Sequence, residues 1–341
     1  MTRKVLVVAH GGRQAAVSAM VEAVRELKDV GFEVVLHDAE LADALTGTHV
    51  ARERGEHWLE DIELAVVLGG DGTILRAAEL VRGTSVPLFG VNLGHVGFLA
   101  ESERENLRDA VRRLAAGDYL VERRSALDVE IERPGTDVVH DWALNEATLE
   151  KADRHLMVEV EVEIDGQPLS SFGCDGVVMA TATGSTAHAF SAGGPVMWPD
   201  VEAILIVPLA AHALFARPLV VGPGSTVSVE VTPGSGVGGV VTMDGRRQVE
   251  APAGTRITVR CGASPVLLAR LNDAPFTDRL VRKFDLPVAG WRERAALRAE
   301  RSRDDERPQS EQRLRTGDQT AGAQAGTAPE DSGLAGGGSG A

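Results

Sequence analysis

The residues best suited to chemistry in this sequence form a short glycine-rich turn that carries one carboxylate. The turn reads GGDGT over residues 69–73, directly after an apolar run that ends at Leu68 and before a helical pattern. Glycines let backbone N–H groups approach phosphate oxygens closely, and a helix N-terminus attracts anions. Asp71 would repel phosphate, so we expect it to meet a hydroxyl group or a metal ion. The alternative is that Asp71 only caps the helix.

A second candidate binding segment lies at residues 173–195. It reads GCDGVVMATATGSTAHAFSAGGP and combines glycines with small hydroxylated residues. A backbone of this composition can approach a flat or polyphosphate ligand closely. The alternative is a glycine-rich corner of a β-structure.

Two shorter signals accompany these segments. Asn145 and Glu146 stand within an alternating strand pattern, and GVNLGHVGFLAE at 90–101 places glycines after a strand, as a loop beside the 69–73 turn would need. Taken alone, the Asn-Glu pair indicates a solvated strand face. The nine histidines show no metal-binding spacing such as HExxH, so we expect no dedicated zinc site.

The elements that must position the 69–73 turn alternate between strands and helices. Short apolar runs predict strands, and apolar residues at helical spacing predict helices. This alternation indicates a mostly parallel sheet covered on both faces, with ligands bound at the carboxyl ends of its strands. The predicted strands are 5–9, 33–36, 64–68 and 86–91, and the predicted helices include 17–27, 73–82 and 104–115.

The second half of the chain changes to a period of two. Valines alternate with glutamates over 158–163, and an Asp-Gly turn signal follows at 165–166. Similar alternation at short spacing predicts an antiparallel, sandwich-like domain. We therefore predict an α/β domain at 1–122 and a β-rich domain at 123–292. The residues from 293 to 341 hold too few large aliphatic side chains to offset their ordering entropy, which predicts a disordered tail with at most a frayed helix near 293–303.

Charge and composition narrow the classes of partner. Thirty-five basic against 50 acidic residues give a formal net charge of -15, which disfavours nucleic acid and anionic membranes. Two cysteines form no disulfide framework, and no apolar run has the length of a membrane span or a signal-peptide core. We expect a cytoplasmic protein.

Seven segments together carry a resemblance to a known family. They are GGDGT at 69–73, GVNLGHVGFLAE at 90–101, ALNEATLEK at 143–151, CDGVVMATATGSTAHAFSAGGP at 174–195, AHALFARPLVV at 211–221, DGRR at 244–247 and FTDRLVRKF at 276–284. In this order they resemble the bacterial NAD kinases, and the long actinobacterial forms most of all. The resemblance covers about residues 4–292.

The resemblance implies a two-domain kinase that moves the terminal phosphoryl group of ATP, or of polyphosphate, to the adenosine 2′-hydroxyl of NAD. Residues 1–122 would bind the nucleotide or phosphate, with Mg²⁺ or another divalent cation, and residues 123–292 would bind NAD. Homodimers or homotetramers are usual in the family. Backbone N–H groups of the 69–73 turn would hold the phosphates.

The resemblance also assigns individual residues. Asp71 is the general base for the hydroxyl. The substrate-binding positions are Gly72, Arg76, Asn145, Glu146, Asp175, Thr186, Ala187, His188, Ala189, Phe190 and Ser191. Positions that match more loosely are Thr73, Asn92, Arg154, Thr183, Gly184, Ser185, Ala210 and Arg246.

This sequence departs from the family pattern at a few positions. Ala182 and His188 replace a proline and a tyrosine of the usual PTGSTAY, and His95 stands where an arginine or lysine is usual. The missing tyrosine removes a stacking surface and a hydroxyl from the predicted dinucleotide pocket. Two other readings remain: a lipid kinase of the diacylglycerol type, which shares GGDGT, and a paralogue that binds a dinucleotide without catalysis.

Overall fold

The structure is a computed structural model that describes residues 3–9, 14–36, 58–59, 61–94, 97–272, 274–288 and 290. Residues 1–286 form one compact unit. The predicted tail at 293–341, including the frayed helix at 293–303, lies outside the described residues, as does His95.

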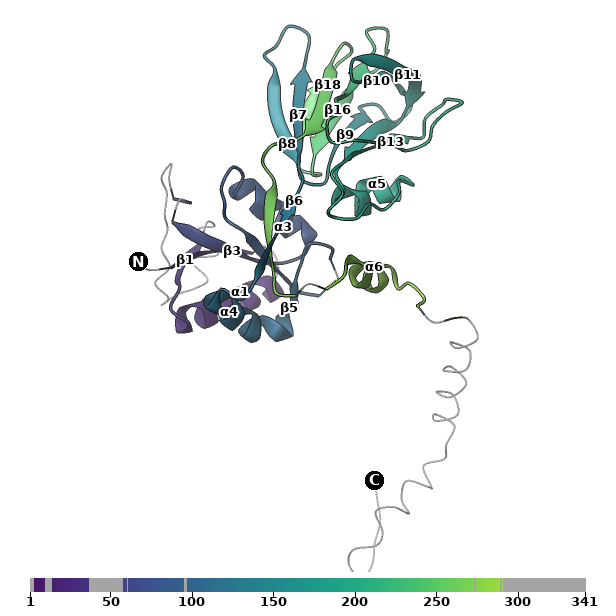
Figure 1. Ribbon diagram of the computed structural model, residues 1–341. Helices are drawn as coiled ribbons and strands as arrows, with labels where there is room; N and C mark the ends of the chain where they lie inside the picture. Colours follow the sequence, from purple (N-terminus) through teal and green to yellow (C-terminus); the bar gives the residue numbers. More distant parts are fainter. Residues whose placement is uncertain are drawn as a thin grey trace, which may run out of the picture. The chain divides into compact units, whose positions relative to one another are not determined.

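This unit contains a seven-stranded sheet in the order β2-β1-β3-β4-β19-β6, with β5 paired to β4 (Figure 1). All neighbouring strands in this sheet run parallel, except that β6 pairs antiparallel with β19. The predicted α/β class is thus confirmed, and β19 returns to this sheet from late in the chain. The strands are β1 (Lys4–Ala9), β2 (Glu33–Leu36), β3 (Ile62–Leu68), β4 (Leu88–Asn92), β5 (Ser102–Glu103), β6 (Leu120–Arg124) and β19 (Val266–Arg270).

Helices cover both faces of this sheet. Successive side chains of each strand point to opposite faces, and apolar side chains on both faces pack against helices. Val5 and Val7 pack with α1 and α4 on one face, while Leu6 and Val8 pack with α3 on the other. Figure 1 shows α1 and α4 side by side. None of the described helices has the length and apolarity needed to cross a membrane. The helical bounds are α1 (Gln14–Asp29), α3 (Asp71–Leu80), the 3₁₀ turn η1 (Arg104–Asn106) and α4 (Leu107–Ala116).

The observed bounds differ from the predicted ones by a few residues. Helix α3 begins at Asp71 rather than at residue 73, because Gly70 is extended and serves as the N-cap. The predicted helix over 104–115 begins as the turn η1, and Gly117 in the left-handed conformation ends α4. Strand β4 begins after Pro87, which has no N–H to donate to a ladder.

Two six-stranded antiparallel sheets form the β-sandwich that the alternating pattern predicts. Their orders are β11-β10-β15-β18-β7-β8 and β14-β13-β12-β9-β16-β17, and one apolar core contains residues of both. The strands of the first are β7 (Leu127–Glu132), β8 (Val139–Ala143), β10 (Val158–Ile164), β11 (Gln167–Cys174), β15 (Val227–Val231) and β18 (Arg256–Cys261). Those of the second are β9 (Glu146–Lys151), β12 (Gly176–Ala180), β13 (Ile204–Leu209), β14 (Leu219–Val221), β16 (Gly239–Met243) and β17 (Arg247–Ala251).

Three short helices complete the unit. The turn η2 (Gly184–Thr186) leads into α5 (His188–Ser191), whose Ala189 packs with Val178, Ala180 and Leu205 on the outer face of the second sheet. Helix α6 (Phe276–Phe284) follows β19. Both α5 and α6 take part in the site described next.

Candidate active site

Asp71 is the first residue of α3, and it does not cap the helix. Its two carboxylate oxygens accept backbone N–H groups from the loop after β4: Phe98 donates to Oδ2 and Leu99 to Oδ1, each at 3.0 Å. The N-cap is Gly70, with no side-chain capping bond. The carboxylate is therefore oriented by a neighbouring loop, and it keeps further lone pairs for a ligand.

Two glycines make this arrangement sterically possible. A Cβ atom on Gly97 would lie 2.3 Å from Oδ1 of Asp71, and one on Gly69 would lie 2.3 Å from Oγ1 of Thr73. Any side chain at residue 97 would displace the carboxylate. Gly97 of the GVNLGHVGFLAE segment thus allows the close approach of the loop to Asp71.

The 69–73 turn offers fewer free amides than its sequence suggests. Gly69 donates its N–H to the carbonyl of Val91 at 3.0 Å, and Thr73 donates to the carbonyl of Gly70 at 2.9 Å. The N–H groups in the first turn of a helix have no intrahelical acceptor. Gly70 and the exposed Gly72 are therefore the donors in this turn best placed to bind an anion.

Asn145 and Glu146 are buried, with 8% and 7% of their surface exposed. The Glu146 carboxyl receives a backbone hydrogen bond from His188, yet its Oε2 has no hydrogen-bond partner among the described residues. Burial, followed by the nearby Asp244 carboxylate, raises the pKa of Glu146 to about 8. A buried carboxyl with an unpaired oxygen is suited to a polar ligand that supplies a hydroxyl group.

Asp244 organises this pair, and the sequence did not single it out as a site residue. Its carboxylate accepts the N–H groups of Leu144 at 2.9 Å and Asn145 at 2.7 Å, and its own N–H donates to the carbonyl of Glu146 at 3.0 Å. It is 4% exposed, and burial raises its pKa. The DGRR segment at 244–247 was part of the family resemblance, which assigned a looser role to Arg246 and none to Asp244.

Some hydroxyl groups in the predicted binding segment from Thr183 to Ser191 bind the protein's own backbone. The Ser185 hydroxyl donates to the carbonyl of Ala182 at 2.6 Å and accepts the N–H of Met197 at 2.9 Å, and Thr186 donates to the carbonyl of Thr183 at 3.1 Å. A Cβ on Gly184 would lie 2.1 Å from the carbonyl oxygen of Asn145. Close packing of this turn on Asn145 explains its glycine.

Packing joins these pieces around α3 and the 97–99 loop. Leu144 belongs to the core cluster that contains Ile74, Leu75 and Leu99. The ring of Phe190 stacks on Phe284 with centroids 4.6 Å apart, and Phe284 in turn lies 5.7 Å from Phe98. The structure thus gathers Asp71, Asn145, Glu146 and the 188–191 segment into one region.

Other predicted residues support this region from its edges. Arg246 binds Glu79 of α3 at 3.2 Å and is 45% exposed. Buried Asn92 accepts the N–H of Gly94 at 3.3 Å and donates to Glu103 at 3.4 Å, so it shapes the turn after β4. Arg76 is half-buried on α3, and Ala187 precedes α5.

Three predicted residues lie elsewhere. In the register of β9 and β12, Glu146 pairs with Ala180 and Glu150 with Gly176, so Asp175 lies near the other end of both strands. Asp175 lies one residue beyond Gly176, five positions from the level of Glu146, so at ~3.4 Å per strand residue the separation is roughly 17 Å. Asp175 binds Lys151 at 2.5 Å and donates its N–H to Leu209. Arg154 and Ala210 lie at this same end, directly after β9 and β13.

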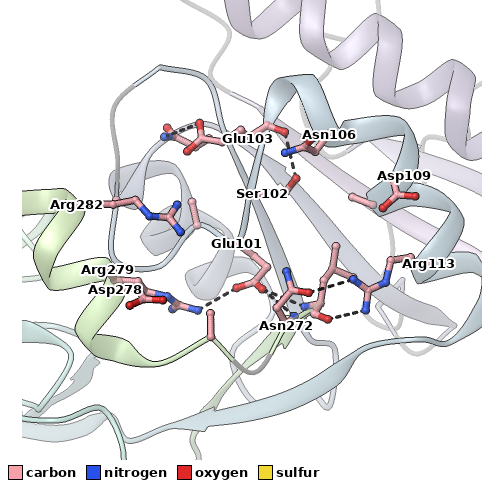
Figure 2. Close-up of a pocket in the computed structure, with 16 residues that line it drawn as sticks. Glu101, Ser102, Glu103, Asn106, Asp109, Arg113, Asn272, Asp278, Arg279 and Arg282 are labelled. Atoms are coloured by element: carbon pink, nitrogen blue, oxygen red, sulfur yellow. Dashed lines mark hydrogen bonds and ion pairs between the residues drawn. The ribbon is translucent and has the colours of Figure 1, made fainter. Parts of the chain in front are cut away.

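A cavity of about 420 Å³ adjoins the 97–101 loop on the side of α4 and α6 (Figure 2). Gly97, Ala100 and Glu101 of the loop line this cavity, but its lining does not include Asp71, Asn145 or Glu146. Its charged lining mixes both signs, with Arg113, Arg279 and Arg282 near four carboxylates. Among the described residues no group of three or more His, Cys, Asp or Glu side chains is placed to hold a metal ion.

Comparison with known proteins agrees with this geometry. Residues 5–119 match the ATP-NAD kinase N-terminal domain, and residues 144–271 match the ATP-NAD kinase C-terminal domain. The NAD kinase of Leifsonia xyli subsp. xyli is 56% identical over 295 residues, covering 85% of this chain and 97% of the relative. NAD kinase 2 of Streptomyces avermitilis is 54% identical over 293 residues, covering 85% of this chain and 97% of the relative.

Solved structures have the same fold. A yeast NADH kinase complexed with NADH superimposes with a TM-score of 0.78 at 22% identity, covering 84% of this chain and 89% of that one. An Archaeoglobus fulgidus NAD kinase in complex with ATP gives a TM-score of 0.62 at 27% identity, covering 84% and 100%. The lipid-kinase reading of GGDGT is thereby set aside. With both family domains matched in order and relatives of more than 50% identity along most of the chain, this protein belongs to the NAD kinase family.

Proposed function

We propose that this chain transfers the terminal phosphoryl group of ATP to the adenosine 2′-hydroxyl of NAD and so makes NADP. The observation that carries the proposal is the Asp71 carboxylate, held at the start of α3 by two N–H groups and free to accept another hydrogen bond. As the 2′-oxygen attacks the phosphorus, Asp71 takes its proton and ADP leaves.

The remaining residues position the two substrates. The amides of Gly70 and Gly72 at the N-terminus of α3 suit the phosphates of the nucleotide. Asn145 and Glu146 suit the ribose and base of NAD, because Glu146 keeps an unpaired oxygen in a buried setting. In this division, residues 1–122 bind the nucleotide or phosphate and residues 123–292 bind NAD.

A divalent cation would enter the site with the nucleotide. Asp71, whose two oxygens each accept one N–H group and keep further lone pairs, is the carboxylate nearest to where the phosphates would bind at the start of α3. When bound, Mg²⁺ would neutralise negative charge on the phosphates. The protein itself would bind the phosphates through backbone N–H groups of the 69–73 turn.

Incubation of the purified protein with NAD, ATP and Mg²⁺ tests the activity, with NADP detected by mass. Replacing ATP by polyphosphate, and NAD by NADH, defines the donor and the acceptor. Binding of NAD without any NADP, even in a single turnover, would instead support the non-catalytic dinucleotide-binding reading.

We infer further that the site is shared between copies of the chain in a homodimer or homotetramer. The resemblance assigns Asp175, Arg154 and Ala210 to the NAD pocket, yet within one chain Asp175 lies roughly 17 Å along the strands from Glu146. A second copy can bring its own Asp175 end to this Glu146. Light scattering on the purified protein should therefore give at least a dimer mass, and an active monomer would contradict the inference.

We also propose a cytoplasmic location. Cys174 and Cys261 are both unpaired, which suits a reducing compartment.

The departure at His188 yields a further prediction. Its backbone bond to Glu146 does not depend on the side chain, so His188→Tyr should keep that contact and add a larger ring to the pocket. We expect the KM for NAD to fall several-fold with little change in kcat, because stacking is worth ~0.5 to 1.5 kcal/mol and acts on ground and transition states alike. Steady-state kinetics at neutral pH measure both constants.

The exposed His140 on β8 offers a matched control, since His140→Tyr makes the same change away from the site. An unchanged KM in His188→Tyr would exclude the stacking account. A collapsed kcat would show that His188 takes part in the chemistry.

A further inference from the structure

The loop that orients Asp71 is itself held by two arginines from late in the chain. Nη1 of Arg279, on α6, donates to the carbonyl of Phe98 at 3.2 Å. Nη1 of Arg270, on β19, donates to the carbonyl of Leu99 at 3.0 Å. Phe98 and Leu99, whose N–H groups bind Asp71, therefore each have an arginine guanidinium bound to their carbonyl oxygen.

Arg279 is connected to Asp71 through a single peptide group. The carbonyl of Phe98 and the N–H of Leu99 belong to the same amide, so one end of this amide accepts from Arg279 and the other donates to Oδ1 of Asp71. A cation at the carbonyl polarises the amide and strengthens its N–H as a donor. The second arginine acts on the next amide, which does not bind Asp71.

Buried contacts fix the position of Arg279. Its Nη2 lies 3.0 Å from Oε2 of Glu101, which also accepts from Arg270 at 3.1 Å. The other oxygen of Glu101 accepts the N–H groups of Leu271 and Asn272. The side chains of Glu101 and Arg270 are each 4% exposed, and that of Arg279 is 16% exposed. Figure 2 shows Arg279 reaching Glu101 from α6.

Aromatic contacts hold the same face of α6 against the site. Phe276, Arg279, Leu280 and Phe284 recur at helical spacing. The rings of Phe276 and Phe284 lie 5.9 and 5.7 Å from that of Phe98, and Phe284 stacks on Phe190 of α5. One helix thus touches both the Asp71 loop and the predicted NAD-binding segment.

We propose that Arg279 is a positioning residue for the phosphoryl transfer, acting on Asp71 through the Phe98–Leu99 amide. This inference rests on the proposed role of Asp71 as the base. Arg279 holds the amide in the orientation that aims the carboxylate, and it does so without touching substrate. Its effect should therefore fall on kcat and should require Asp71.

A double-mutant cycle tests the inference. Arg279→Met should lower kcat roughly 10- to 100-fold, the cost of misplacing a reacting group, and leave the KM values for NAD and ATP within about three-fold. In an Asp71→Asn background the same change should alter the residual rate by less than about three-fold, because residues that act as a unit are not additive.

Arg282 provides the matched control. It is exposed, carries the same charge on the same helix, and makes none of the hydrogen bonds to the 97–101 loop found among the described residues. Arg282→Met should leave kcat unchanged. Should Arg279→Met fold poorly, Arg279→Lys repeats the cycle, since Lys keeps the charge but cannot span both Phe98 and Glu101 with a planar fork.

The outcomes separate this inference from the proposed function. Normal turnover in Asp71→Asn would show that Asp71 is not the base, which contradicts the proposed function as well as this inference. If Asp71→Asn collapses the rate while Arg279→Met leaves kcat intact, or lowers it equally with either residue at position 71, the positioning role alone is overturned.

Discussion

Asp71→Asn should lower kcat by ~10² to 10⁴ while leaving NAD binding nearly intact, since this is the range for loss of a general base. The amide cannot take the proton of the 2′-hydroxyl. The single side-chain oxygen of the asparagine can accept only one of the two N–H groups that Phe98 and Leu99 donate, because the asparagine NH₂ group must face the other. We therefore also expect a melting temperature lower by a few degrees, as one buried donor loses its acceptor.

Steady-state kinetics, calorimetric titration with NAD and thermal melting give the three readouts. Asp109→Asn, on the exposed face of α4, removes the same charge away from the site and should match the unsubstituted protein in all three. Turnover near the unsubstituted value would remove Asp71 as the base. Loss of NAD binding together with turnover would make the residue structural.

The fold followed from the sequence because its signals are local. Apolar runs and helical spacing gave the parallel sheet, alternating valines gave the sandwich strands, and GGDGT marked the strand-to-helix turn that carries Asp71. Each of these patterns reflects burial of one face of a single element. The confirmed α/β and sandwich architecture is the sum of such local preferences.

The site was less visible because its decisive contacts join residues far apart in the chain. Asp244 binds amides about one hundred positions earlier, and Arg279 binds a carbonyl 181 positions earlier. No period or spacing encodes such contacts. Conversely, residues 173–195 read as one binding segment, yet β12 separates Asp175 from Thr183 and so sends the two to opposite ends of a strand. The roles assigned to these residues stay predictions until the variants are measured.

Glu146→Gln should separate stability from substrate binding. Burial and Asp244 raise the pKa of the Glu146 carboxyl to about 8, from an ordinary value of 4.5. Below pH 4.5 the carboxyl is protonated in both folded and unfolded chains, and it carries no ionisation cost. Between pH 4.5 and 8 the unfolded chain ionises while the folded chain keeps its proton, so the free energy of unfolding falls as pH rises.

A neutral glutamine removes this cost. We expect the free energy of unfolding of Glu146→Gln to exceed that of the unsubstituted protein by an amount that grows from pH 4.5 to 8, reaching on the order of a few kcal/mol. Denaturant titrations of the NAD-free protein at several pH values measure the difference. A gap that does not change with pH would contradict the assignment of a raised pKa to this carboxyl.

The same variant should bind NAD about ten-fold more weakly or worse near pH 8, because a hydrogen bond to a charged group is worth ~1.5 to 3 kcal/mol and Gln offers only a neutral acceptor. Glu132→Gln is the control, since Glu132 lies exposed on β7 in the other sheet of the sandwich, away from both Glu146 and Asp175. It should change neither NAD affinity nor the pH dependence of stability. If Glu146→Gln, and not the control, gains stability at high pH and loses NAD affinity, then Glu146 binds the substrate and destabilises the fold. Unchanged NAD affinity in Glu146→Gln would show that Glu146 does not line the NAD pocket.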